Sequence, residues 1–394
     1  MIKWMSTAGR LRAAFLFGFA SLGSWMPALT VWLEDHGLSK SRIGYVSAIP
    51  WLVMLIVQPI WGVAADRIGK KKCFIITSFV AVLAFVLMPA VEKDQGMIVG
   101  MTIAFALFNT PVLPLLDSIT LDLAAGGLIR SYGTFRFWGA PGFAVGALLA
   151  SWLTAVWNID VIFYLSALFL LLMWLVLAAL EVTSSSSAGE FSINGIGYLI
   201  KDGLLMTFLA VIALVSVAQS SSSFFLTVYL REIGSTPAVT GTALGVQSIS
   251  ELPFYFLAAW LLKKTSAGKV VLIAVFGTAL RLLMYSLNQR AAWVIGIETM
   301  NGITWTLLWI ASVDFVDKRV PAAWRTTGQS LLWAAYFGAG AIAGNIFSGR
   351  LYEMMPMRGV YGINSALAAA AGLFAFVIFS LMRRRSLEKS FKTH

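Results

Sequence analysis

The feature that most constrains this chain is a series of apolar segments, separated by short polar breaks. A helix that crosses a lipid bilayer needs roughly 20 predominantly apolar residues, and these segments reach that length. The chain has 394 residues, of which 59% are hydrophobic and only 12% are charged. A soluble domain could not bury that much apolar surface, whereas lipid can solvate it. The sequence therefore predicts an all-α polytopic membrane protein.

Twelve segments are expected to cross the membrane. They cover residues 11–33, 43–65, 73–91, 97–121, 135–156, 159–180, 203–229, 237–262, 269–288, 291–313, 326–349 and 359–381. The polar, Ser-rich stretch 181–190 divides them into six and six. This division predicts a six-helix bundle over 1–180, a cytoplasmic central loop over 181–202, and a second six-helix bundle over 203–394 with a basic cytoplasmic tail. Two such bundles with internal inverted repeats are typical of secondary transporters.

The distribution of Lys and Arg predicts the orientation. Placing both termini in the cytoplasm gives that side a roughly threefold excess of basic residues, while acidic residues divide almost evenly between the two sides. This bias accounts for the net charge of +11 without a nucleic-acid partner.

The sequence lacks the residues that several classes of function require. One cysteine, Cys73, excludes an internal disulfide, and two histidines, His36 and His394, provide no His-rich metal site. The chain has no Gly-x-x-x-x-Gly-Lys-Ser/Thr loop for ATP phosphates. We therefore expect no cofactor, no metal and no enzymatic activity.

A charged turn between the second and third apolar segments carries an ordered motif. It reads Gly62-x-x-x-Asp66-Arg67-x-Gly69-Lys70. This pattern resembles the loop between the second and third helices of the major facilitator superfamily. The resemblance implies the fold of that superfamily, with the Asp and Arg forming inter-helix contacts that hold one gate closed. The alternative is a basic loop that serves only as a topology signal.

Ionisable residues inside the apolar segments are candidates for function, because each costs at least about 2.5–3.5 kcal/mol at the bilayer centre. Asp117, Glu251, Arg281 and Glu298 are such residues, and Arg136 lies at the start of the fifth segment. Their order along the chain predicts two pairs, Asp117 with Arg136 and Glu251 with Arg281. Glu298 has no obvious partner. The four intramembrane residues are candidates for proton coupling, and the alternative is that both pairs are static struts.

The motif around Arg136 points to one branch of the superfamily. The run Tyr132-Gly-Thr-Phe-Arg136-Phe-Trp138-Gly139, together with the earlier Asp117, resembles the signature of the permeases for lactose, nucleosides and phenylpropionate. The resemblance implies that Asp117 and Arg136 contact substrate, and that acids of the second half carry the proton. The tenth segment lacks the His and following Glu of the lactose permease relay, so coupling would move to Glu251, Glu298 or Asp117.

Polar and aromatic side chains in the apolar segments are candidates for the substrate cavity. Besides Asp117 and Arg136, they are Trp25, Trp51, Asn109, Trp138, Gln219, Gln247, Tyr255, Asn301, Trp305, Gln329 and Tyr336. Amides and indoles suit a sugar or a nucleoside. Arg136 and Arg281 would equally suit an aromatic carboxylate. Each aromatic could instead be a packing residue.

These features predict a monomeric secondary transporter in the bacterial inner membrane. Its expected partners are a small organic solute, protons and the lipid bilayer, and its expected activity is proton-coupled symport by alternating access. One alternative is a proton-driven exporter of sugars or drugs, because Gly139 to Gly146 resembles the Gly/Pro motif of drug antiporters. Another is a membrane protein that transports nothing.

Overall fold

A computed structural model describes residues 6–91, 94–129, 132–180, 197–321 and 324–392. All the secondary structure in these ranges is helical, and eleven of the helices are long and apolar enough to cross a membrane. The predicted all-α polytopic fold is therefore confirmed. The Ser-rich stretch 181–190 lies outside the described residues.

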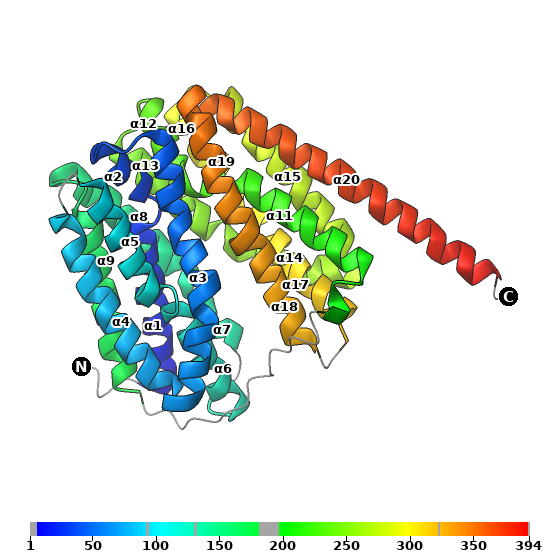
Figure 1. Cartoon of the computed structure of the whole chain (residues 1–394), viewed down its shortest axis with the longest axis horizontal. Helices are drawn as coiled ribbons and strands as arrows, with labels where there is room; N and C mark the ends of the chain where they lie inside the picture. Colours follow the sequence, from blue (N-terminus) through cyan, green and yellow to red (C-terminus); the bar gives the residue numbers. More distant parts are fainter. Residues whose placement is uncertain (1–5, 92–93, 130–131, 181–196, 322–323, 393–394) are drawn as a thin grey trace.

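The helices of the first half lie together on one side of the molecule (Figure 1). They are α1 (Thr7–Trp25), α2 (Leu29–Asp35), α3 (Lys40–Ile68), α4 (Lys70–Leu87), η2 (Met88–Ala90), α5 (Gln95–Asn109), α6 (Val112–Ala125), α7 (Tyr132–Arg136), α8 (Gly139–Val156) and α9 (Val161–Ala178).

The helices of the second half follow from residue 203. They are α11 (Gly203–Phe224), α12 (Leu226–Glu232), α13 (Pro237–Ile249), α14 (Glu251–Lys264), α15 (Ala267–Leu287), α16 (Ala291–Glu298), η3 (Gly302–Leu307), α17 (Leu308–Arg319), α18 (Arg325–Trp333), η5 (Ala334–Gly340), α19 (Ala341–Met354) and α20 (Met357–Lys392).

The eighth predicted segment, 237–262, is not one continuous helix. It forms α13 and α14, which meet at Ser250. Pro253 is the physical reason, because it has no N–H to donate to the Ile249 carbonyl and so opens the helix one turn before it. Eleven of the twelve expected spans thus correspond to segments long and apolar enough to cross a membrane, and the remaining one to a bent pair of helices. The bend makes Glu251 the first residue of α14.

Other helices are interrupted where they border the centre of the molecule. Pro27 separates α1 from α2, and Pro111 separates α5 from α6. Two segments, η3 and η5, are π-helical. Such segments hold an extra residue within a turn and often lie at functional sites. The interrupted helices and the π-helical segments therefore indicate a functional site in the space between the two halves.

The two halves meet at one end of the molecule and diverge at the other. In Figure 1, α2, α12 and α13 lie close together at the upper end, whereas α6 and α7 lie apart from α17 and α18 at the lower end, where the N-terminus lies. At the closed end the α3 and α19 backbones touch, since a Cβ on Gly44 would lie 2.5 Å from the Asn345 carbonyl oxygen. The structure is therefore closed on the face opposite the N-terminus.

Candidate substrate and proton site

A cavity of about 390 Å³ lies between the two halves. Both halves contribute to its wall, including the interrupted helices and both π-helical segments. Of the residues that the sequence indicated, the wall contains Trp25, Trp51, Asn109, Asp117, Arg136, Gln219, Gln247, Glu251, Tyr255, Arg281, Asn301, Trp305 and Tyr336. The cavity thus gathers polar side chains from distant parts of the sequence.

Three of the indicated residues do not line the cavity. Trp138 packs against a hydrophobic core cluster that contains residues of both halves. Gln329 donates from Nε2 to the Val313 carbonyl of α17 at 3.1 Å. Glu298 is completely buried behind the wall. The assignment of Trp138 and Gln329 to the cavity wall is therefore wrong, because helices that are apolar all round give no sign of which face points inward.

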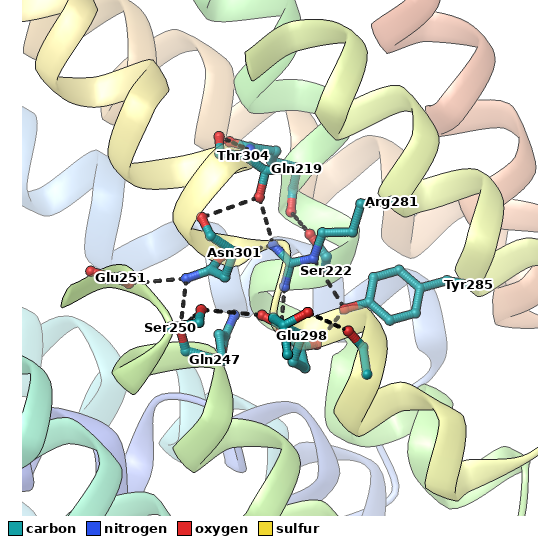
Figure 2. Close-up of polar contacts among 12 residues, drawn as sticks. Gln219, Ser222, Gln247, Ser250, Glu251, Arg281, Tyr285, Glu298, Asn301 and Thr304 are labelled. Carbon is teal, nitrogen blue, oxygen red and sulfur yellow. Dashed lines mark hydrogen bonds and ion pairs between the residues drawn. The ribbon is translucent and has the colours of Figure 1, made fainter. Parts of the chain in front are cut away.

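Arg281 is the centre of a buried polar cluster (Figure 2). Its guanidinium forms an ion pair with Glu298, whose side chain is 0% exposed. Arg281 Nη1 also donates to Asn301 Oδ1 at 2.7 Å and to Thr304 Oγ1 at 2.9 Å. Its Nε donates to the Tyr285 hydroxyl at 3.2 Å, and that hydroxyl donates to Glu298. The protein itself therefore occupies four of the five N–H donors of Arg281.

Glu251 is held by an amide and not by a cation. Its Oε1 accepts from Asn301 Nδ2 at 3.0 Å, and the same nitrogen donates to the Gln247 carbonyl at 3.3 Å. Arg136 and Arg281 are near enough to attract the Glu251 carboxylate electrostatically. The predicted ion pair of Glu251 with Arg281 is wrong in its partner, since Arg281 pairs with Glu298 and Asn301 connects the two groups (Figure 2).

Asp117 has a tyrosine as its contact partner. Its Oδ1 accepts from the Tyr132 hydroxyl at 2.8 Å. The Arg136 guanidinium lies over the Phe19 ring, 4.1 Å from its centroid. Arg136 also attracts the Asp117 carboxylate electrostatically. Among the described residues, Asp117 and Arg136 form no direct ion pair. The prediction placed the two groups near each other correctly but missed Tyr132, although the motif contains it.

The side-chain amide of Gln219 forms hydrogen bonds with other residues of the protein through both its nitrogen and its oxygen. Its Nε2 donates to the Thr304 carbonyl at 2.8 Å and to Thr278 Oγ1 at 3.1 Å. Its Oε1 accepts from the Tyr336 hydroxyl at 2.6 Å. These bonds connect α11, α15, η3 and η5, so Gln219 and Tyr336 position the cavity wall.

One turn of α3 presents polar atoms without a partner. Ser47 Oγ and Trp51 Nε1 are both buried and form no hydrogen bond with any residue that the structure describes, and both residues line the cavity. The Trp51 ring stacks on Phe337 with centroids 5.2 Å apart, and its neighbour in that wall is Trp333, stacked on Phe337 at 4.7 Å. Sequence reasoning missed Ser47, Trp333 and Phe337, because Ser and aromatic residues are common in such helices.

The charged turn at Gly62 to Lys70 lies at the diverging end. Asp66 and Arg67 are exposed and form no ion pair within the described ranges. Lys70 Nζ lies 2.7 Å from Asp122 Oδ2, within the same half. Gly69 has φ +96°, which favours glycine and explains its place in the turn. In this conformation the motif does not bridge the halves, and its gating role stays a prediction.

Residues 9–363 match the family model described as MFS_1 like family. The chain belongs to the MFS_1-like family. The maltose permease of Geobacillus stearothermophilus is 26% identical over 379 residues, which cover 95% of each chain. The probable 3-phenylpropionic acid transporter of Escherichia coli K12 is 23% identical and covers 90% of this chain and 93% of its own.

A solved structure of similar fold is the nucleoside transporter NupG. It superposes with a TM-score of 0.84 at 16% identity, covering 95% of this chain and 100% of its own. The relatives of this MFS_1-like chain are permeases and transporters, and none of those named is an enzyme. The chain is accordingly a multi-pass membrane transporter of a small molecule, and the resemblance to the major facilitator superfamily is confirmed.

Proposed function

We propose that this transporter imports a neutral polyhydroxylated ring compound, a sugar or a nucleoside, by proton symport across the bacterial inner membrane. The observation that carries the proposal is the occupied guanidinium of Arg281. Glu298, Asn301, Thr304 and Tyr285 take four of its five N–H donors. The one donor left for a ligand cannot form the two parallel hydrogen bonds with which arginine binds a carboxylate.

The remaining polar groups of the cavity favour a neutral substrate. Among the described residues that line the cavity, Arg136 is the cation left for a ligand, and it shares the wall with the carboxylates of Asp117 and Glu251. An aromatic carboxylate would meet both acids, whereas sugar hydroxyls can donate to them. The unpaired donors of Ser47 and Trp51 would serve oxygens on the same ring. The printed names of the maltose permease and the nucleoside transporter agree with this class.

Glu251 is the carboxylate best suited to carry the proton. Its hydrogen-bond partner is a neutral amide, so protonation of Glu251 breaks no ion pair. Protonation of Glu298 would instead leave Arg281 as an unpaired charge in the protein interior, which is costly. Substrate and proton would therefore meet on the same wall of the cavity.

Transport would proceed by movement of the two halves, 1–180 and 203–394, around the cavity. If both termini lie in the cytoplasm, as the distribution of Lys and Arg predicts, the closed end of the molecule faces the outside. We propose that one monomer completes this cycle, since the cavity is built from a single chain.

The test of coupling is Glu251→Gln. Gln keeps an oxygen that accepts from Asn301 but cannot ionise, so pH-driven accumulation in proteoliposomes should fall at least about tenfold while substrate exchange persists. The probes are maltose, sucrose, adenosine and 3-phenylpropionate, first ranked by thermal shift. Asp314→Asn, which removes a surface pair with Lys318, is the control and should transport normally.

Three results would contradict this proposal. Accumulation that survives Glu251→Gln would remove Glu251 as the proton carrier. Stabilisation by 3-phenylpropionate alone would overturn the neutral substrate class. Uptake driven only by an outward proton gradient would indicate an antiporter that exports.

The indole N–H of Trp51 gives a second prediction. Trp51→Phe keeps a ring against Phe337 but removes the unpaired donor. One neutral hydrogen bond is worth about 0.5–1.5 kcal/mol, so the Kd of the bound probe should rise roughly 2- to 12-fold. The unfolding temperature without ligand should stay the same or rise, because a buried unpaired donor has gone. An unchanged Kd would assign the indole to packing.

A further inference from the structure

Each half contains a helix that breaks at the closed end of the cavity. In the first half the break at Pro27 separates α1 from α2, and in the second half the break at Phe225 separates α11 from α12. A threonine follows each break. Each lies three residues after a backbone carbonyl at its break, Thr30 after Pro27 and Thr227 after Phe224.

The two threonines bond across the interface in a reciprocal way. Thr30 Oγ1 donates to the Phe224 carbonyl of the other half at 2.7 Å. Thr227 Oγ1 donates to the Pro27 carbonyl of the first half. The two hydroxyl oxygens lie 3.4 Å apart, and both side chains are buried. Within the described ranges, no backbone N–H donates to either carbonyl.

We infer that Thr30 and Thr227 are gating residues that hold the outer side of the cavity closed. The inference rests on the alternating access of the proposed function. A helix break inside a membrane protein frees a backbone carbonyl, which must find another donor. Here each half supplies the donor for the other, so neither carbonyl is satisfied when the halves separate. Opening therefore requires water to replace both hydroxyls.

The break is also connected to the substrate cavity. Phe224, whose carbonyl accepts from Thr30, packs edge-on against the Trp51 ring at 5.7 Å. Both residues line the cavity. A substrate that moves Trp51 would therefore act directly on the residue that carries one of the two bonds.

A second contact between the same two helices, α2 and α12, offers a matched control. Arg231, on the same helix as Thr227, pairs with Asp35 at 2.6 Å and with Glu34 at 3.5 Å. The Arg231 side chain is 52% exposed, so solvent and salt weaken this pair. We expect the buried hydroxyls, rather than this ion pair, to control the opening.

The test measures access from outside. In a Cys73→Ser background, Ser223→Cys places a single thiol on the cavity wall next to Phe224. A membrane-impermeant maleimide is added to intact cells that express the protein. Thr30→Val with Thr227→Val keeps the side-chain shapes but removes both donors, so labelling should accelerate on the order of tenfold. Thr30→Ser with Thr227→Ser keeps the hydroxyls and should label at the parent rate. Arg231→Gln should change the rate less than about twofold.

Several outcomes would overturn the inference. They are labelling of the double valine variant at the parent rate, acceleration by the double serine variant, and an effect of Arg231→Gln as large as that of the valines. If the double valine variant does not reach the membrane, each single valine variant should give an intermediate rate, and parental rates in both would also overturn it. Because labelling needs no substrate, failure of the parent to take up any probe would overturn the proposed transport and leave the threonine bonds standing.

Discussion

Neutralising Glu298 alone, as Glu298→Gln, is expected to abolish transport and to lower the free energy of unfolding by about 3–5 kcal/mol. The side chains of Arg281 and Glu298 are 4% and 0% exposed. Removing one charge therefore strands the other in a medium that cannot solvate it. The Tyr285 hydroxyl would also lose its carboxylate acceptor. The measurement is thermal unfolding of the purified protein together with uptake in proteoliposomes.

A double variant separates the electrostatic effect from the functional one. Arg281→Met with Glu298→Gln removes both charges, so most of the lost stability should return. Transport should stay absent, because Asn301 then loses the guanidinium that fixes its oxygen and no longer orients toward Glu251. As a control, Lys318→Met breaks a surface pair and should cost about 1 kcal/mol or less. A stable, active Glu298→Gln variant would show that this ion pair is dispensable.

The apolar segments could be predicted because their length is set by the bilayer and not by tertiary contacts. The bend between α13 and α14 was missed since a single proline hardly changes the apolar character of the segment 237–262. Pro253 was visible in the sequence, but its effect depends on whether neighbouring helices accommodate the freed carbonyl.

The partners of the buried charges were harder to predict. Depth in the membrane can be counted along the chain, and it placed Glu251 and Arg281 at the same level. Rotation about the helix axis cannot be counted in helices that are apolar all round. In addition, the π-helical segment after Asn301 contains an extra residue in its turn. This residue changes the angle about the helix axis between Glu298 and Thr304. In the structure Arg281 therefore pairs with Glu298 and not with Glu251.

The closed end of the molecule depends on two glycines that the sequence did not single out. Gly44 of α3 and Gly349 of α19 come from different halves, and a Cβ on Gly349 would lie 2.8 Å from the Gly44 Cα. Both obstacles are backbone atoms, which cannot move aside as a flexible side chain can. Gly44→Leu should therefore hold the outer side open. Overpacking typically costs 1–3 kcal/mol, so uptake should fall roughly 5- to 160-fold.

The same substitution should leave binding intact, because Gly44 lies at the interface and not on the cavity wall. The measurement is uptake in proteoliposomes, together with impermeant maleimide labelling of Ser223→Cys in intact cells, which should accelerate. Gly100→Leu is the matched control, since a Cβ on Gly100 meets no atom within 4 Å. It should transport and label like the parent. Slow labelling of the Gly44→Leu protein with normal uptake would contradict this prediction. It would mean that α3 and α19 can separate without opening the cavity. The outer side would then have to open elsewhere along the interface.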